Sequence, residues 1–415
     1  TIATRPVVAP VTRPGAAGPP ARRGELDLLR ALVVVGLVFF HTAVIFGAGE
    51  FPVKAAAENR VATAFLAFGA TWGMPLLFVI AGTGTWYSLR SRGAAAFARE
   101  RLRRLGVPLL VGLLTLVPLQ AYLGLRRAGD AGSLAGFYAR FWDVRPSLGF
   151  PFLLRAAPGT GLFETGHLWF LVCLLGFSLL LLPGLALLGR PPGSRLLEWL
   201  AGLLARPGAV LLLAVPLAAV EAALGSEVGH GAWNRGSYAL LLAYGYLLAA
   251  DARIGEALRR QWRPAMALGL LLFAAAGPLF AAAAAHGDPF TDGQPLGVAF
   301  RAVKGVDGWL WVVAILGLAR SRAARRAGAA ARPGRLGAYA SQAVLPFYLL
   351  HEPVIVVVAC LVLPWRIGAG GQYLLISLAS LAATWLLYDL GVRRTRPSRF
   401  LFGMKPTRPT RRTSS

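Results

Sequence analysis

Residues 25–46 read ELDLLRALVVVGLVFFHTAVIF, and this stretch decides how the rest of the chain is interpreted. A helix of this length is about 33 Å long, enough to cross a hydrocarbon core of about 30 Å. Three ionisable side chains interrupt the apolar run, namely Asp27, Arg30 and His41. Ionisable residues within a membrane helix are costly and therefore indicate function. The stretch predicts a membrane helix that carries chemistry.

Arg30 and His41 are expected to share one face of this helix. Eleven residues at about 100° each bring the chain about 20° past three full turns, and they rise about 16 Å. Arg30 is then expected at one membrane surface, paired with Asp27, and His41 near the middle of the membrane. The alternative is that Arg30 extends to lipid headgroups and His41 bonds to a neighbouring helix. The shared face favours a functional pair.

Composition places the chain in the membrane class. Of its 415 residues 56% are apolar and 15% are charged, whereas soluble domains average about 25% charged residues. A net charge of +25 invites a nucleic-acid partner, but the positive charges lie in short segments between apolar runs, where orientation signals belong. We therefore expect no nucleic-acid binding. Cys173 and Cys360 both lie in apolar runs, so neither a disulfide nor a metal site is expected.

Apolar runs of roughly span length recur along the chain. The sequence predicts an all-α, polytopic integral membrane protein with about ten transmembrane helices. The predicted spans are 27–48, 62–89, 105–125, 165–189, 207–225, 235–250, 264–286, 300–319, 337–363 and 371–391.

Lys and Arg residues alternate between rich and poor segments along these spans, and the rich segments include both ends of the chain. The positive-inside rule then predicts a plasma (inner) membrane protein with both termini cytoplasmic. A cleaved signal peptide is disfavoured because the first run lacks a small-residue cleavage site. We predict a disordered cytoplasmic tail over 1–24, a membrane domain over 25–392 and a basic cytoplasmic tail over 393–415.

A basic stretch precedes the third span. Residues 97–110 read FARERLRRLGVPLL, in which Arg101 and Arg104 are neighbours on one helix face. Two guanidinium groups can hold phosphate oxygens in pairs of hydrogen bonds. The alternative is a positive anchor that contacts anionic lipid.

The ninth span contains two adjacent ionisable residues, His351 and Glu352, in FYLLHEPVIVVVA (347–359). Pro353 follows them, and it leaves one helical carbonyl without its N–H donor. His351 or Tyr348 is expected to satisfy that carbonyl if the motif is only a structural kink.

A further polar motif opens the fourth span, where residues 164–171 read ETGHLWFL. His167 and Trp169 are candidate substrate-binding residues, and the alternative is an interfacial aromatic belt. Asp307 and Glu221 fall near predicted span ends, where we expect water to be close, and they receive no role.

These motifs together resemble the family-3 membrane acyltransferases. The resemblance rests on LDLLR followed by His41 and on the Arg-x-x-Arg pattern of RERLRRLGVP. GHLWFLVCLL and YLLHEPVIV resemble the glucan-modifying, succinyltransferase-like branch of the family. The resemblance covers roughly residues 24–392.

The resemblance implies an acyltransferase core without a bound cofactor or metal. Such proteins take an acyl group, here of the acetyl or succinyl class, from cytoplasmic acyl-CoA. They pass it to a hydroxyl of an extracytoplasmic carbohydrate or glycolipid acceptor, in contact with membrane lipids. The high Ala, Gly, Arg and Leu content is typical of a GC-rich bacterial genome.

The resemblance also implies residue roles. His41 matches the essential histidine and Arg30 its partner, while Arg101 and Arg104 match acyl-CoA contacts. A neutral imidazole suits a general base that takes the hydroxyl proton, and a transient acyl-histidine is the other route. His351 and Glu352 lie in the segment that resembles the glucan branch and are candidate substrate-binding residues.

Two other classes stay open. A polytopic secondary transporter of a small solute or saccharide would also have many spans and charges within the membrane. A haem-binding carrier with His41 and His351 as axial ligands is the third interpretation.

Overall fold

The computed structural model describes residues 24–326 and 335–405 of the chain. The predicted tail 1–24 lies outside the described residues except for Gly24. The longest helices are α1 (Gly24–Phe46), α2 (Arg60–Arg92), α12 (Ala252–Ala284), α13 (Pro295–Arg326), α14 (Arg335–Val362) and α15 (Gly368–Leu386). The shorter α-helices are α3 (Ala94–Arg101), α4 (Val107–Val111), α5 (Val117–Arg127), α6 (Leu134–Phe141), α7 (Trp169–Leu180), α8 (Leu182–Leu188), α9 (Gly193–Leu204), α10 (Ala214–Leu224), α11 (Arg235–Ala250) and α16 (Arg396–Leu401).

Other regular elements are short. The π-helical stretches are η1 (Leu102–Gly106), η2 (Gly112–Leu116) and η6 (Leu387–Val392). The 3₁₀ turns are η3 (Gly166–Leu168), η4 (Ala209–Leu213) and η5 (Val228–His230). Strands β1 (Val144–Pro146) and β2 (Leu154–Ala156) form one antiparallel hairpin, in which Arg145 lies opposite Arg155.

The predicted all-α polytopic class is confirmed. Within the described residues, seven helices are long and apolar enough to cross a membrane, and the count rises to nine if each of two bent helix pairs is one span. These pairs cover Gly166–Leu188 and Gly193–Leu224. The predicted sixth span, 235–250, corresponds to α11, whose 16 residues fall below the 18 that the length criterion requires.

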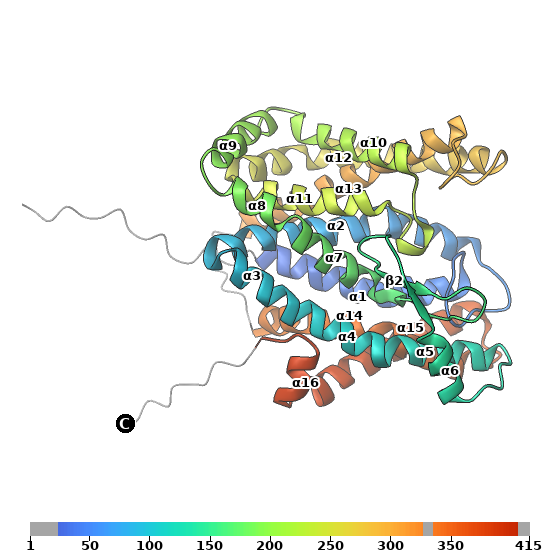
Figure 1. Ribbon diagram of the computed structural model, residues 1–415. Helices are drawn as coiled ribbons and strands as arrows, with labels where there is room; N and C mark the ends of the chain where they lie inside the picture. Colours follow the sequence, from blue (N-terminus) through green and yellow to red (C-terminus); the bar gives the residue numbers. More distant parts are fainter. Residues whose placement is uncertain (1–23, 327–334, 406–415) are drawn as a thin grey trace, which may run out of the picture.

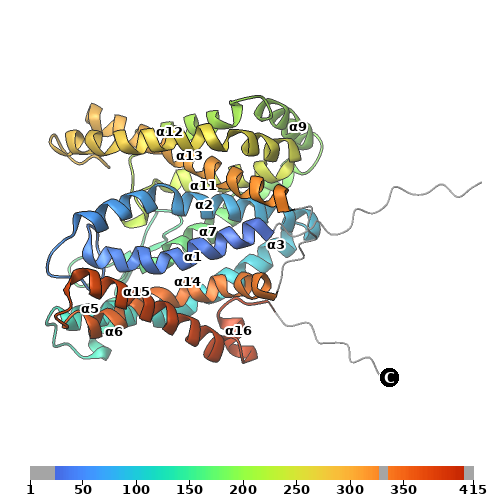
Figure 2. The ribbon, with the colours of Figure 1, turned by 180° about the vertical axis from the view of Figure 1, so that it is seen from behind.

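The helices form a bundle in which segments distant in sequence lie side by side. Helix α1 packs on α14, α2 and α15, while α2 packs on α11, and α13 packs on α12 and α10 (Figure 1; Figure 2). Helix α1 begins at the end of the bundle near α3 and α16, which we call the arginine end. The β1–β2 hairpin and α6 lie at the opposite end, which we call the loop end (Figure 1).

Exposed apolar side chains show which solvent the bundle requires. Helix α12 is among the most apolar spans, yet only 11% of its most apolar stretch is buried inside the protein. Leu268 and Leu271 of this helix, which are neighbours on one side of it, are exposed. Soluble monomers rarely expose so large an apolar surface, so this face is the one that lipid covers.

Two glycines allow α2 and α11 to touch. A Cβ added at Gly82 would lie 2.0 Å from the carbonyl oxygen of Leu242, and one added at Gly245 would lie 2.0 Å from that of Val79. Small residues at such crossings permit close backbone packing between membrane helices. This contact brings the backbones of α2 and α11 together inside the bundle.

The third span is continuous from Ala94 to Arg127 but includes two wider π-helical stretches, η1 and η2. Each stretch ends shortly before a proline, Pro108 or Pro118. A proline removes one helical N–H and its ring crowds the preceding turn. Local widening to a π-helix accommodates this defect, and it sets the direction of Arg101 and Arg104 at the start of the span.

Candidate active site

Glu352 of α14 is the centre of a buried polar cluster in the bundle. Its Oε2 lies 3.4 Å from Nδ1 of His41, and its Oε1 accepts a hydrogen bond of 2.9 Å from the amide nitrogen of Gln120. The Glu352 side chain is 6% exposed and that of His41 is 18% exposed. A buried carboxylate is stable only when it is paired or hydrogen-bonded, and here helices α1 and α5 supply the partners.

His167 approaches Glu352 from a third direction. Its Nδ1 lies 3.6 Å from Oε1 of Glu352, while its Nε2 lies 3.2 Å from the carbonyl oxygen of Leu349. Because a carbonyl only accepts, Nε2 donates to it. Leu349 is four residues before Pro353, so its carbonyl is the one that the proline leaves without a helical donor. The expectation that His351 or Tyr348 would satisfy this carbonyl was wrong, because His167 does so from another helix.

His351 lies behind this arrangement and is fully buried. Its Nδ1 donates to the carbonyl of Tyr348 at 2.7 Å, and its Nε2 has no hydrogen-bond partner in the described part of the chain. Its ring centroid is 5.1 Å from that of His41 and 5.4 Å from that of His167. Three imidazoles therefore surround one carboxylate.

This donor set includes a possible metal-binding group. Ligand atoms of His41, His351 and Glu352 lie within 4.8 Å of one another. Imidazole nitrogen and carboxylate oxygen suit zinc and similar ions. Within the protein, Nδ1 of His351 and Oε1 of Glu352 are already used in hydrogen bonds, so the same side chains can also form an acid–base centre without a metal.

His41 is not at the midpoint of its helix. It lies five residues before the end of α1, on the side of the loop end. The helix begins three residues earlier than predicted and ends two residues earlier. The predicted ion pair of Arg30 with Asp27 is present, with 3.8 Å between Nη1 and Oδ1.

The predicted arginines gather at the arginine end. Arg30 interacts electrostatically with Arg104, and Arg101 with both. Arg101 donates to the hydroxyl of Thr85 at 3.1 Å and lies over the ring of Phe97. These three guanidinium groups come from α1, α3 and η1, so the fold, not the local sequence, forms the cluster.

Arg104 has partners of its own. It bonds Glu100 at 3.4 Å and the carbonyl of Gly403 at 3.3 Å. Glu100 also pairs with Arg92. The segment after residue 392 is therefore attached to the arginine end through Gly403 and through α16, which packs on α4.

A cavity of about 2650 Å³ opens beside the cluster. It follows α1 from Leu29, next to Arg30, to Val44, beyond His41, and it is also lined by Glu352. Toward the loop end its wall includes Arg155 of β2. Its lining is mostly apolar with a few polar groups, as is usual for small-molecule sites.

Glu164 lines this cavity at the loop end. Burial raises the pKa of the Glu164 carboxyl, and the negative charge of Glu352 raises it further. The carboxyl is therefore easier to protonate than an exposed one.

Trp169 does not join the cluster around Glu352. It lines the cavity and packs against His230 and Tyr238, with ring centroids 5.8 Å and 5.3 Å away. The two candidates in ETGHLWFL therefore lie apart. His167 in η3 points toward Glu352, whereas Trp169 at the start of α7 lines a different part of the cavity.

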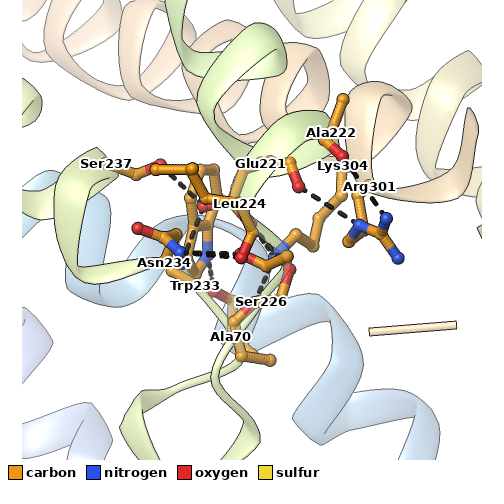
Figure 3. Close-up of polar contacts among 12 residues, drawn as sticks. Ala70, Glu221, Ala222, Leu224, Ser226, Trp233, Asn234, Ser237, Arg301 and Lys304 are labelled. Carbon is orange, nitrogen blue, oxygen red and sulfur yellow. Dashed lines mark hydrogen bonds and ion pairs between the residues drawn. The ribbon is translucent and has the colours of Figure 1, made fainter. Parts of the chain in front are cut away.

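Glu221 is fully buried instead of being close to water as expected. It accepts hydrogen bonds from Ser226 at 2.7 Å and from Ser237 at 2.6 Å, and it pairs with Lys304 at 2.7 Å (Figure 3). The reason is that α10 packs on α13 and ends in a loop that folds over the carboxylate. Asp307 is likewise only 1% exposed, because α13 begins at Pro295 and places it well inside the helix.

Gln120 was not foreseen as a functional residue. The signal available was a single amide within the apolar run VPLQAYLGL. Its partner Glu352 is more than 200 residues away along the chain, so no local pattern could connect the two.

A buried carboxylate with three imidazoles thus lies beside a cavity inside a bundle of membrane helices, which is an arrangement that can take up and release protons. The chain belongs to the acyltransferase 3 family, because the model of that acyltransferase domain matches residues 23–389. Comparisons with curated proteins and with solved structures found no match. The protein is therefore a membrane acyltransferase.

Proposed function

We propose that this enzyme transfers an acetyl or succinyl group from cytoplasmic acyl-CoA to a hydroxyl of an extracytoplasmic carbohydrate or glycolipid. The observation that carries the proposal is the contact of 3.4 Å between His41 Nδ1 and Glu352 on the wall of the cavity. An imidazole oriented by a carboxylate is the arrangement that activates a hydroxyl for acyl transfer.

Glu352 selects the form of His41 that works as a base. A proton on Nδ1 is directed to Glu352 Oε2, which leaves Nε2 free to accept the proton of an acceptor hydroxyl. The hydroxyl oxygen attacks the thioester carbonyl as it loses this proton. The C–S bond then breaks, and the proton carried by His41 passes to the departing thiolate of coenzyme A.

His167 and Gln120 fix the carboxylate in turn. Since His167 donates Nε2–H to Leu349, its Nδ1 attracts Glu352 only when that nitrogen is also protonated. Nδ1 of His167 and the side-chain amide of Gln120 both face Oε1, so Oε2 is left for His41. Glu352 thus carries a single negative charge that stabilises the imidazolium formed on His41 during transfer.

The arginine end suits the donor. Coenzyme A carries its phosphates at one end and its thioester on a long thin arm. The cluster of Arg30, Arg101 and Arg104 offers guanidinium groups that bind phosphate. The separation of Arg30 from His41, about 16 Å along α1, matches the extended arm, and the cavity follows α1 over this length.

The orientation of the protein in the membrane follows from the distribution of Lys and Arg residues between its two ends. The arginine end carries both described ends of the chain (Figure 1), and segments rich in Lys and Arg stay on the cytoplasmic side. We therefore propose cytoplasmic termini in the plasma membrane of a bacterium, with the loop end outside. The acceptor enters the cavity from that side and the acyl-CoA from the other. The transporter alternative is not favoured, since the family is that of acyltransferases.

The test uses purified protein in lipid nanodiscs with labelled acetyl-CoA or succinyl-CoA and a total surface-glycan extract, followed by mass spectrometry of the glycans. His41→Ala should reduce transfer by roughly 10² to 10⁴-fold. His286→Ala, which changes an exposed histidine at the loop end, is the matched control and should transfer as wild type. Transfer at the wild-type rate by His41→Ala would refute the mechanism.

A further inference from the structure

Asp307 of α13 is a buried carboxylate on the cavity wall that the acid–base mechanism does not use. It is 1% exposed, and it lines the same cavity as His41 and Glu352. Over residues 24–326 and 335–405, no Lys, Arg or His side chain forms an ion pair with it, and its Oδ1 has no hydrogen-bond partner. An isolated carboxylate inside a membrane helix is costly and marks a site where a ligand supplies the missing charge.

The nearest cation on the same helix is already used. Lys304, one turn before Asp307, pairs with Glu221 at 2.7 Å and donates to Ser226 at 2.7 Å (Figure 3). It also donates to the carbonyl of Ala232, so its three N–H groups are all engaged. Lys304 therefore cannot neutralise Asp307 without abandoning the buried Glu221.

Aromatic rings surround the same part of the cavity. Phe68 of α2 has ring centroids 5.0 Å from Trp311, 5.3 Å from Phe273 and 6.1 Å from Trp72. These four side chains all line the cavity. The indole nitrogens of Trp72 and Trp311 are buried and have no hydrogen-bond partner among residues 24–326 and 335–405. Trp311 interacts with Asp307 but does not reach hydrogen-bond geometry.

A second wall of this space is rigid. The indole of Trp233 donates to the carbonyl of Ala70 at 3.0 Å, and Lys304 lies 4.8 Å from its ring (Figure 3). A Cβ added at Gly308, next to Asp307, would lie 2.3 Å from this ring. The pair of Lys304 and Glu221 thus holds Trp233 against α13, and the position of Asp307 is fixed rather than adaptable.

We propose that Asp307 and the rings of Phe68, Trp72 and Trp311 form a subsite for an ammonium group, so that the acceptor is an amino sugar. A protonated amine neutralises the carboxylate and is attracted to the aromatic faces. A neutral hydroxyl offers a hydrogen bond but no positive charge, so the carboxylate stays costly to bury unless it takes up a proton. That the bound amino sugar is an acyl acceptor rests on the proposed function, whereas binding of an ammonium group at Asp307 does not depend on acyl transfer.

The test compares three probes that differ at one position of the same ring. These are methyl β-glucosaminide, which carries an ammonium group, methyl β-glucoside, which carries a hydroxyl, and the methyl glycoside of N-acetylglucosamine, which carries a neutral amide. The protein is labelled with 5-fluorotryptophan in nanodiscs, and Trp72→Phe and Trp311→Phe assign the two fluorine resonances. Each probe is titrated into the protein at a pH at which the amine is protonated, and binding is followed by the shifts of these two resonances.

The glucosaminide should bind about tenfold more tightly than either neutral probe, as expected when a neutral hydrogen bond becomes a charge-assisted one. Asp307→Asn, which keeps the size and removes the charge, should abolish this preference, whereas Asp389→Asn in η6 should keep it. Equal binding of the three probes by the wild type would overturn the proposal without any variant, as would a preference that survives in Asp307→Asn.

The outcome is separable from that of the proposed function. His41→Ala should keep the ammonium preference while losing transfer, because binding at Asp307 needs no base. A wild type that binds the glucosaminide selectively but transfers no acyl group would leave the subsite supported and refute the acyl transfer instead.

Discussion

The imidazole of His167 donates from Nε2 to the backbone carbonyl of Leu349, 3.2 Å away on another helix. This carbonyl is available because Pro353 has no N–H to offer it. A defect in one helix therefore orients a histidine on a second helix, and that histidine faces the carboxylate of Glu352.

Pro353→Ala tests this relationship. Alanine restores the N–H that bonds Leu349 within the helix, which weakens the bond from His167 and loosens its hold on Glu352. One hydrogen bond is worth about 0.5 to 1.5 kcal/mol, so we expect kcat to fall roughly threefold to tenfold with KM for acyl-CoA unchanged. Pro346→Ala in the same helix is the control, and equal rates for the two variants would contradict the relationship.

Glu352→Gln tests the orienting role of the carboxylate. Glutamine keeps the size but removes the charge that stabilises protonated His41, and its amide favours the wrong tautomer. We expect kcat to fall by roughly 10² to 10⁴-fold, as when a triad carboxylate becomes an amide. The measurement is transfer of labelled acyl groups under saturating acyl-CoA. Glu58→Gln, at an exposed position of the loop end, should be unaffected, and a fully active Glu352→Gln enzyme would exclude an orienting role.

The double variant Arg101→Ala with Arg104→Ala tests the donor site. Each guanidinium removed costs the charge-assisted hydrogen bonds it makes to phosphate, about 1.5 to 3 kcal/mol. KM for acyl-CoA should therefore rise tenfold or more, and kcat should change little. Arg103→Ala removes one positive charge from the exposed residue between them, and it is compared with each single variant, Arg101→Ala and Arg104→Ala, as well as with the double variant. If Arg103→Ala raises KM as much as the double variant, the effect is general surface charge and not a site.

Lys304 and Glu221 form a buried pair whose two halves depend on each other. Lys304→Met leaves the carboxylate of Glu221 uncompensated, and breaking such a pair costs about 3 to 5 kcal/mol. The midpoint of thermal unfolding, followed in detergent, should fall strongly. Adding Glu221→Gln to Lys304→Met should recover part of the loss. A double variant that is less stable than Lys304→Met alone would show that the pair is not coupled as described.

Gly82 and Gly84 lie on the same helix and differ in what surrounds them. A Cβ at Gly82 would strike the backbone of α11, whereas one at Gly84 would meet nothing within 4 Å. Gly82→Ala should lower the thermal unfolding midpoint markedly, because neither backbone can yield. Gly84→Ala should leave it unchanged or raise it, since alanine favours helix by about 1 kcal/mol. Similar midpoints for the two variants would indicate that α2 and α11 are not in backbone contact.

The sequence alone determined the class of fold and which side of α1 carries Arg30 and His41. Runs of apolar residues longer than a bilayer core specify helices, because lipid cannot bond the backbone. The spacing of Arg30 and His41 placed both on one side of a helix, because helical periodicity is a local property. For the same reason Arg101 and Arg104 were recognised as neighbours, and the pair of Asp27 with Arg30 was predicted correctly.

Only the tertiary structure decided which of these residues meet. Gln120, His167 and Glu352 come from three distant parts of the chain, and no periodicity links them. It is packing that separated Trp169 from His167 and that turned Glu221 and Asp307, expected near water, into buried charges. Glu221 has a cationic partner in Lys304, whereas Asp307 has none among the residues that the structure describes. The reason is that side-chain pairing between helices depends on distances that the order of residues does not contain.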